Sequence, residues 1–131
     1  MNNTLFIADS ESSTIRAIDL STQIAYNVVG GDGNPKNLFS FGDQDGEEFT
    51  CKLQHPLAVI GVKDKLVVCD SYNNKLKFVY PKSKYCLSFV GEKEGGLNDS
   101  KVLMKEPSGL AVKWVGEDWE LFVADSNNDC I

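Results

Sequence analysis

Short apolar runs separated by clusters of turn residues set the pattern of this chain. An apolar run at residues 66–69 ends in a polar turn cluster at 70–74. Apolar Leu76, Phe78 and Tyr80 follow at every second position, which is the period of a half-buried strand. No segment shows a sustained helical period with caps at both ends. The pattern therefore predicts four antiparallel strands, at about residues 57–62, 65–69, 75–80 and 85–90.

The same pattern occurs three times, and an Asp-Ser pair marks each copy. The pairs are spaced by 61 and then 55 residues, at Asp9-Ser10, Asp70-Ser71 and Asp125-Ser126. The first spacing holds without a gap from Leu5 to Gly30. Partial sets of strands are therefore expected on both sides of the complete set, at about residues 4–8, 14–19, 24–29, 109–115 and 120–124.

Recurring four-stranded antiparallel units predict an all-β fold, a partial β-propeller with about one complete blade flanked by two partial ones. A closed propeller needs about four to eight blades, so this chain is not expected to close on its own. The expected organisation of residues 1–131 is a partial blade, a loop, a full blade, a second loop and a partial blade, at 1–30, 31–54, 55–91, 92–106 and 107–131.

The repeat residues resemble the NHL-repeat family of β-propellers. The resemblance rests on Leu-x-Val-Ala-Asp-Ser, preceded by Pro-x-Gly-Leu-Ala-Val, and it extends from about Thr4 to Ile131. It implies a fragment of a larger cytosolic protein that carries further blades. At the position of the family's histidine this chain has Ser13, Asn74 and Asp129, so no function is expected from that histidine.

Charge and composition narrow the function classes. The formal net charge is −6 and there is one histidine, so generic nucleic-acid binding is not expected. No segment has the roughly 18 consecutive apolar residues of a membrane span, so no membrane partner is expected either. The cysteines are scattered without a Cys-x-x-Cys pair, and they are expected to be reduced thiols of a cytosolic protein: Cys51, Cys69, Cys86 and Cys130.

Residues that could carry chemistry have simpler structural explanations. Each Asp-Ser pair follows a strand, where a carboxylate can accept backbone N–H bonds within a turn. His55 has no partner at a metal or triad spacing. The acidic stretch 43–48 lacks the spacing of a calcium loop, and the glycines at 30–33 lack that of a phosphate loop. We therefore expect no catalytic residue, no cofactor and no metal ligand.

The loop at residues 31–54 is the most distinctive segment, because its length is typical of functional loops. It contains apolar Leu38, Phe39 and Phe41 beside an acidic run. Two interpretations stay open. Leu38 and Phe39 could fold back to cap the blades, or the three side chains could form an anchor for a protein partner.

The sequence favours a non-enzymatic scaffold that binds unidentified protein partners. Propellers present loops around a rigid disc, and no catalytic group is assembled in this sequence. The alternatives are a metal-dependent propeller enzyme of lyase or lactonase type, which needs several ligands, and an RNA-binding NHL propeller, which needs a basic face. Exposed strand edges at both ends predict a tendency to self-association.

Overall fold

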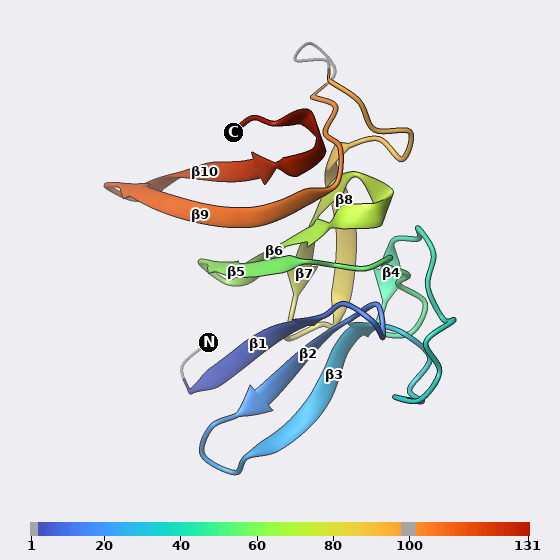
Figure 1. Ribbon diagram of the computed structural model, residues 1–131. Helices are drawn as coiled ribbons and strands as arrows, with labels where there is room; N and C mark the ends of the chain where they lie inside the picture. The colour runs from blue at the N-terminus through green and yellow to red at the C-terminus, as the bar shows by residue number, and fades with distance from the viewer. Residues whose placement is uncertain (1–2, 98–101) are drawn as a thin grey trace.

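The fold consists of three antiparallel sheets, one for each sequence copy (Figure 1). This computed structural model describes residues 3–97 and 102–131. Sheet one has the order β1-β2-β3, sheet two has the order β4-β8-β7-β6-β5, and β9 and β10 form the third. The strands are β1 Thr4–Asp9, β2 Thr14–Asp19, β3 Ile24–Gly30, β4 Gly46–Glu47, β5 Ala58–Val62, β6 Lys65–Asp70, β7 Lys75–Tyr80, β8 Tyr85–Gly91, β9 Pro107–Val115 and β10 Asp118–Asp125.

The prediction of an all-β partial propeller is confirmed. Every predicted strand is present, with ends shifted by at most about two residues, as is usual for strand assignments. The first two sheets have the same register, and each carries a bulge at the same repeat position, after Ile15 in β2 and after Leu76 in β7. We refer to the sheets in chain order as blade one, blade two and blade three.

Blade two has a fifth strand that the pattern did not predict. The two-residue strand β4 lies inside the 31–54 loop and pairs antiparallel with the outer edge of β8, Gly46 opposite Cys86 and Glu47 opposite Tyr85. The loop therefore returns along the rim of blade two. A two-residue strand is too short to show an alternating pattern, so only its pairing with β8 defines it.

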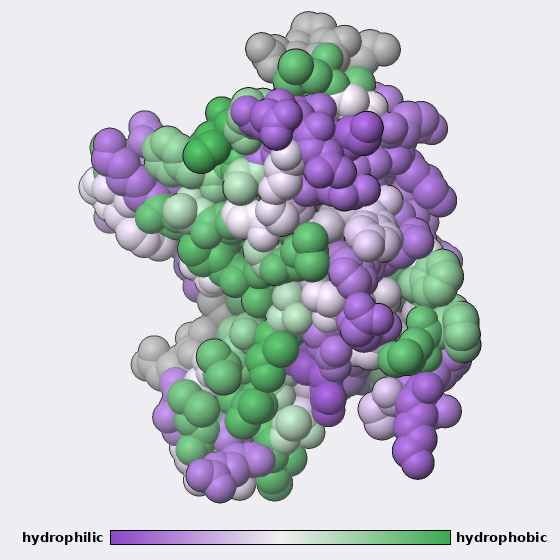
Figure 2. All heavy atoms as spheres, viewed as in Figure 1, coloured by the Kyte–Doolittle hydropathy of each residue, from purple (hydrophilic) through white to green (hydrophobic). Residues whose placement is uncertain are grey.

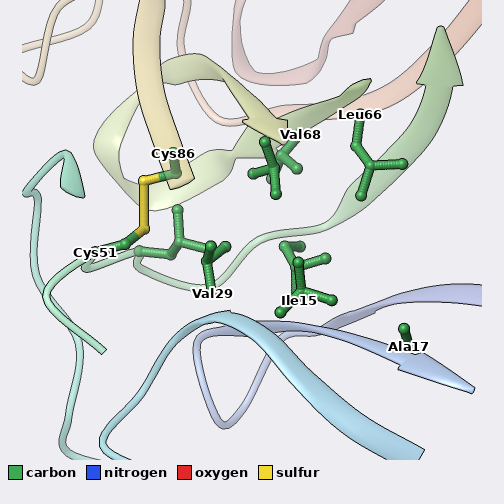
Figure 3. Packing of buried hydrophobic residues seen from close by; sticks show 10 residues of the cluster. Ile15, Ala17, Val29, Cys51, Leu66, Val68 and Cys86 are labelled. Atoms are coloured by element: carbon green, nitrogen blue, oxygen red, sulfur yellow. A yellow bond between two sulfur atoms is a disulfide. The ribbon is translucent and has the colours of Figure 1, made fainter. Parts of the chain in front are cut away.

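The core lies between the blades. A cluster of buried side chains from β2 and β3 packs against side chains from β6, β7 and β8 (Figure 3). Ile15, Ala17 and Val29 face Leu66 and Val68 across this interface. A second, smaller cluster joins blade two to blade three through Cys69, Leu76 and Met104. Apolar burial between adjacent blades is thus what holds the three sheets together.

Repeated backbone geometry at the blade corners shows that the copies are structurally equivalent. Ser13, Asn74 and Asp129, which replace the repeat histidine, all have left-handed backbone with φ of 54°, 57° and 55°. Gly30 and Gly91 end β3 and β8 with φ of 88° and 94°. A Cβ at Gly30 would lie 2.5 Å from the Ser13 carbonyl oxygen, so the sharp strand end requires glycine.

Helical structure is limited, in the described ranges, to two three-residue 3₁₀ turns, η1 Ser71–Asn73 and η2 Ser126–Asn128. No helix in this part of the chain is long and apolar enough to span a bilayer.

Candidate functional site

The aspartates of the Asp-Ser pairs anchor the segment that leads into each blade. Asp70 accepts a hydrogen bond from the Gln54 N–H at 2.7 Å, and Asp125 accepts one from the Lys105 N–H at 2.7 Å. The side-chain amide three residues after each aspartate donates to its second oxygen, in both cases at 2.8 Å. Asp9 instead lies 3.7 Å from the Arg16 guanidinium. At Asp70 and Asp125 the carboxylate therefore acts in turn structure.

The serines of the pairs connect consecutive blades. Ser10 donates its hydroxyl to the carbonyl oxygen of Pro56 at 2.7 Å, and Ser71 donates to that of Pro107 at 2.6 Å. Each bond runs from the corner of one blade to the entrance of the next. Ser126 forms its hydrogen bond with a serine of its own blade. Turn chemistry alone accounted for these serines in the sequence, and it did not reveal their contact with the following blade.

The left-handed corner residues also connect consecutive blades. The Ser13 hydroxyl accepts a hydrogen bond from the His55 N–H at 3.2 Å, and the Asn74 side-chain oxygen accepts one from the Glu106 N–H at 2.8 Å. The His55 ring stacks on Tyr72, with centroids 4.4 Å apart. Short polar side chains at the family's histidine position thus help to join the blades.

The loop places its three apolar side chains outward. Leu38 and Phe41 are each 46% exposed and Phe39 is 84% exposed. The capping interpretation is therefore wrong for Phe39. The Phe49 ring lies beside Gly33 within the same loop. Figure 2 shows hydrophobic atoms on the right-hand side of the molecule, where Figure 1 draws the loop beside β4.

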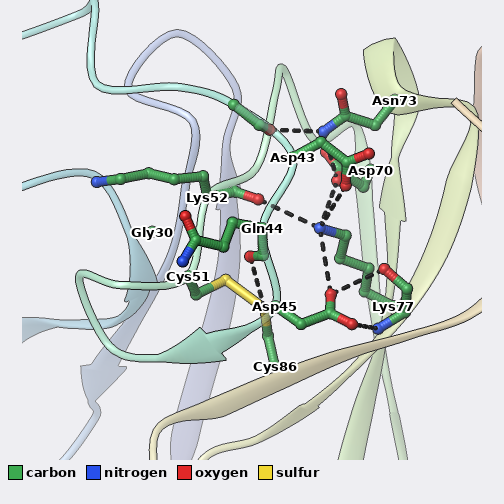
Figure 4. Close-up of a disulfide and its surroundings, with 12 residues drawn as sticks. Gly30, Asp43, Gln44, Asp45, Cys51, Lys52, Asp70, Asn73, Lys77 and Cys86 are labelled. Carbon is green, nitrogen blue, oxygen red and sulfur yellow. Dashed lines mark hydrogen bonds and ion pairs between the residues drawn. A yellow bond between two sulfur atoms is a disulfide. The ribbon is translucent and has the colours of Figure 1, made fainter.

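A buried ion cluster fixes the base of this loop to blade two (Figure 4). The Lys77 side chain is 0% exposed, and its ammonium lies 3.2 Å from the carboxylates of both Asp43 and Asp70 and 3.6 Å from that of Asp45. Lys75 pairs with Asp43 at 2.7 Å. A buried charge is tolerated only where opposite charges and hydrogen bonds compensate it, so the cluster specifies where the loop docks.

Opposing effects act on the carboxylates of this cluster. Burial raises the pKa of Asp70, against the opposing charge of Lys77 and the hydrogen bond from Gln54. Burial alone would also raise the pKa of Asp43. There the hydrogen bond from Lys75 and the charge of Lys77 outweigh it, so the Asp43 pKa lies below its ordinary value.

A disulfide corrects the expectation that all cysteines are reduced thiols. Cys51 and Cys86 are bonded, with their Cα atoms 6.2 Å apart, and both are buried in the core between blades one and two (Figure 4). Their separation of 35 positions hid the pair in the sequence, because only the return of the loop along β8 brings the two cysteines together. Cys69 keeps its thiol; burial, and then the charge of Asp70, raise its pKa to about 12.

The acidic stretch of the loop faces lysine ammonium groups. Asp45 accepts hydrogen bonds from the backbone N–H and the hydroxyl of Ser88, at 2.9 and 2.8 Å. Within residues 3–97 and 102–131, no group of three or more His, Cys, Asp or Glu side chains is placed to hold a metal ion. The alternating positions of Lys75 and Lys77 on one strand were the available sequence signal for this cluster, but the same alternation is also typical of a solvated strand face.

The fold and the repeated corners define the class: a segment of a β-propeller. Segments 38–43 and 52–57 predict, more narrowly, a likeness to NHL repeat-containing protein 2. The chain is 45% identical to that protein of Homo sapiens and 44% identical to that of Gallus gallus, over 95% and 96% of its length. The resemblance to the NHL-repeat family is therefore confirmed.

Further comparisons concern a plant relative, family models and solved structures. The chain is 44% identical, over 96% of its length, to Protein SUPPRESSOR OF QUENCHING 1, chloroplastic, of Arabidopsis thaliana. No protein-family model matches the chain. The fold is similar to that of an auxiliary nutrient binding protein from Bacteroides ovatus, with a TM-score of 0.71 over 98% of this chain and 33% of that one, at 17% identity. This chain spans 18% of the length of the two NHL repeat-containing relatives and 12% of the Arabidopsis one.

Proposed function

We infer that this chain is the partner-binding part of a non-enzymatic scaffold, and that the 31–54 loop presents the anchor. The observation that carries the inference is Phe39, which is 84% exposed at the tip of a loop with a fixed base. Exposed aromatic side chains on a rigid support are typical centres of protein interfaces, because little conformational entropy is lost when they bind.

The base of the loop supports this inference. Lys52 donates from its ammonium to the Gly31 carbonyl oxygen at 2.6 Å and to the Ser40 hydroxyl at 3.1 Å. Asp43, two residues after Phe41, is held by Lys75 at 2.7 Å. The apolar side chains therefore project from a segment that is tied down on both sides. A partner with an apolar cleft of matching size would bind them without first ordering the loop.

The non-enzymatic part of the proposal rests on how the carboxylates are engaged. Asp70 and Asp125 accept backbone and amide hydrogen bonds, and Asp43 and Asp45 face lysine and serine donors. Both sets of carboxylates therefore make structural contacts. Metal analysis of the purified protein separates this proposal from the enzyme alternative, since stoichiometric zinc or calcium would favour an enzyme. A salt-sensitive shift of labelled RNA would likewise favour the RNA-binding alternative.

The cytosolic location expected from the sequence stays a prediction. The Cys51–Cys86 bond argues against it, because disulfides persist mainly in oxidising compartments. Fractionation of the cells that make the protein tests the location directly.

The decisive experiment compares captured partners between variants of equal stability. Phe39→Ala should reduce the recovery of a specific partner by about thirtyfold or more, as expected for an interface centre worth about 2 kcal/mol. Leu5→Ala, at a similarly apolar and 49% exposed position on blade one, is the matched control. Equal recovery with both variants, while both keep the wild-type free energy of unfolding, would refute the role of the loop.

A further inference from the structure

The disulfide joins two segments that are held very differently. Within residues 3–97 and 102–131, the Cys51–Cys86 bond is the one covalent cross-link. Cys86 lies in β8, which is paired with β7 along its length. Cys51 follows a turn, and its N–H donates to the Glu47 carbonyl oxygen at 3.2 Å. The bond therefore connects a strand fixed by its sheet to a segment with little pairing of its own.

Residues 42–52, which we call the covering segment, fold back along blade two and end at this bond. The Lys52 N–H donates to the Gln44 carbonyl oxygen at 2.9 Å, and the Gln44 N–H donates to that of Lys52 at 3.2 Å. The Lys77 ammonium lies 3.2 Å from the Asp43 carboxylate. These contacts are non-covalent and can open and close while the blades stay folded, whereas the disulfide cannot.

Lys52 links the disulfide to the exposed part of the loop. It follows Cys51 directly, and its ammonium donates to the Gly31 carbonyl oxygen at 2.6 Å and to the Ser40 hydroxyl at 3.1 Å. These two contacts close the segment that carries Phe39. A shift of Cys51 therefore moves the group that holds both ends of this segment together.

Reduction of the bond requires such a shift. Two thiol sulfur atoms cannot stay at bonding distance, and both cysteines are completely buried among other core residues. Protein interiors are close-packed and have little spare volume for this separation, so part of the backbone must move. Because β8 is held by its sheet, the residue that moves is Cys51.

We propose that the Cys51–Cys86 bond is a redox-controlled latch, which keeps the Phe39 loop in its binding form when oxidised and releases the loop when a dithiol reduces it. A thiolate of the dithiol attacks one sulfur, and the other cysteine leaves as a thiolate that takes up a proton. The second thiol of the dithiol then displaces the first cysteine in the same way. The protein gains two electrons and two protons, and the dithiol becomes a disulfide.

The reductant reaches the buried bond through the turn before Cys51. The neighbouring residue, Thr50, is exposed, and β4 pairs with β8 over two residues only. Few hydrogen bonds must therefore break to uncover the sulfur atoms, and such local openings cost less free energy than global unfolding. Reduction should thus proceed while the blades are folded. The control of binding rests on the proposed function, whereas the release of the loop does not.

Hydrogen exchange with and without dithiothreitol tests the latch directly. In the reduced protein, the hydrogen-bonded amides of Gln44 and Lys52 should exchange about tenfold faster or more, because the bond no longer limits local opening. Amides of β6, which is paired on both sides, should still exchange much more slowly and show that the blades remain folded. The double variant Cys51→Ser and Cys86→Ser should exchange fast in both conditions. Cys69→Ala, the matched control, should respond as wild type does.

Cleavage by chymotrypsin after Phe39 measures the release of the exposed segment. Cleavage should be faster in the reduced protein. Lys52→Met should make it fast in both redox states, because the ammonium that closes the segment is absent. The latch is overturned by equal exchange of the loop amides in the two redox states, by a bond that dithiothreitol reduces only after global unfolding, or by a Lys52→Met variant that retains the full redox response.

Recovery of a captured partner then tests the control of binding. Reduction should lower the recovery severalfold, because a released loop must be ordered again when it binds. Redox-dependent exchange together with equal recovery by wild type and Phe39→Ala would refute the proposed function and leave the latch. Recovery that depends on Phe39 but not on redox state would refute the control of binding and leave the proposed function.

Discussion

At the scale of single residues, the same repeat position has two different environments in successive blades. Lys77 is buried among three carboxylates, whereas Arg16, one repeat earlier, remains partly exposed beside Asp9 alone. The covering segment, and not the sheet, makes the difference. In blade two, the covering segment thus makes the basic residue at this position part of the structure.

Removal of the buried Lys77 charge tests whether the ion cluster stabilises the fold. Lys77→Met should lower the free energy of unfolding by about 3–5 kcal/mol, because it leaves the buried carboxylate of Asp70 without its cation, whereas Asp43 keeps Lys75. Urea unfolding of the purified variant measures the loss. Lys113→Met removes an exposed lysine whose pair distance is 3.8 Å, and it should cost less than about 0.5 kcal/mol. A loss at Lys77 no larger than this control would show that the cluster is not needed for stability.

Acid should weaken the contact through Asp43. Since its pKa is below the ordinary value of 3.8 in the folded protein, its charged form stabilises the fold above that pH. This contribution is lost as the pH falls through the lowered pKa. Wild type should therefore be more stable than Asp43→Asn at neutral pH, and the two should converge in acid. Urea unfolding over a pH series measures the difference, and Asp64→Asn, in an exposed turn, is the control. A difference that does not vary with pH would contradict the assignment.

At the scale of elements, strands were predictable and the loop was not. Period-two alternation over six-residue strands such as β2 and β7 defines both the strand and its buried face. Because the repeat is 61 residues long, the corner positions of blade one could be predicted from those of blade two. By contrast, β4, the disulfide and the docking of Asp43 onto Lys75 and Lys77 depend on contacts between residues 32 or more positions apart. Local pattern contains no information on such contacts, so only the exposed apolar residues of the loop could be singled out.

The disulfide links two elements, and its removal should loosen the loop. In the chain-entropy account, a cross-link that closes a loop of 35 residues contributes about 3–4 kcal/mol. The double variant Cys51→Ser and Cys86→Ser should therefore lose about this much free energy of unfolding relative to the oxidised protein. Cys69→Ala, a buried cysteine outside the disulfide, controls for the loss of packing alone.

Thiol labelling checks the same bond independently. Without reductant, alkylation in denaturant should modify Cys69 and Cys130 only, and reduction should add Cys51 and Cys86. Mass spectrometry counts the labels. Four labels before reduction would show that the bond is not formed under the conditions of purification.

At the scale of the whole molecule, three blades stand side by side without forming a ring (Figure 1). Blade three consists of β9 and β10 in the described ranges, so neither edge of this two-stranded sheet pairs with a further strand there. Beside it lies an apolar hollow of about 520 Å³, lined in part by Leu76, Val90, Leu121 and Phe122. Unpaired edges next to exposed apolar surface favour association with further chains, as the sequence predicts.

Self-association should therefore depend on concentration and on the edge of blade three. Sedimentation velocity of the 131-residue chain should show larger species at high micromolar than at low micromolar concentration. Phe122, 45% exposed on β10, contributes to the apolar surface, so Phe122→Lys should shift the chain toward monomer. Leu20→Lys places the same charge at a 52% exposed position in a turn of blade one, far from that edge in the sequence, and should leave the distribution unchanged. A chain that is monomeric at all concentrations would show that hydration of these edges outweighs the gain from pairing them. An equal response to the two lysine substitutions would mean that net charge, and not the edge of blade three, controls association.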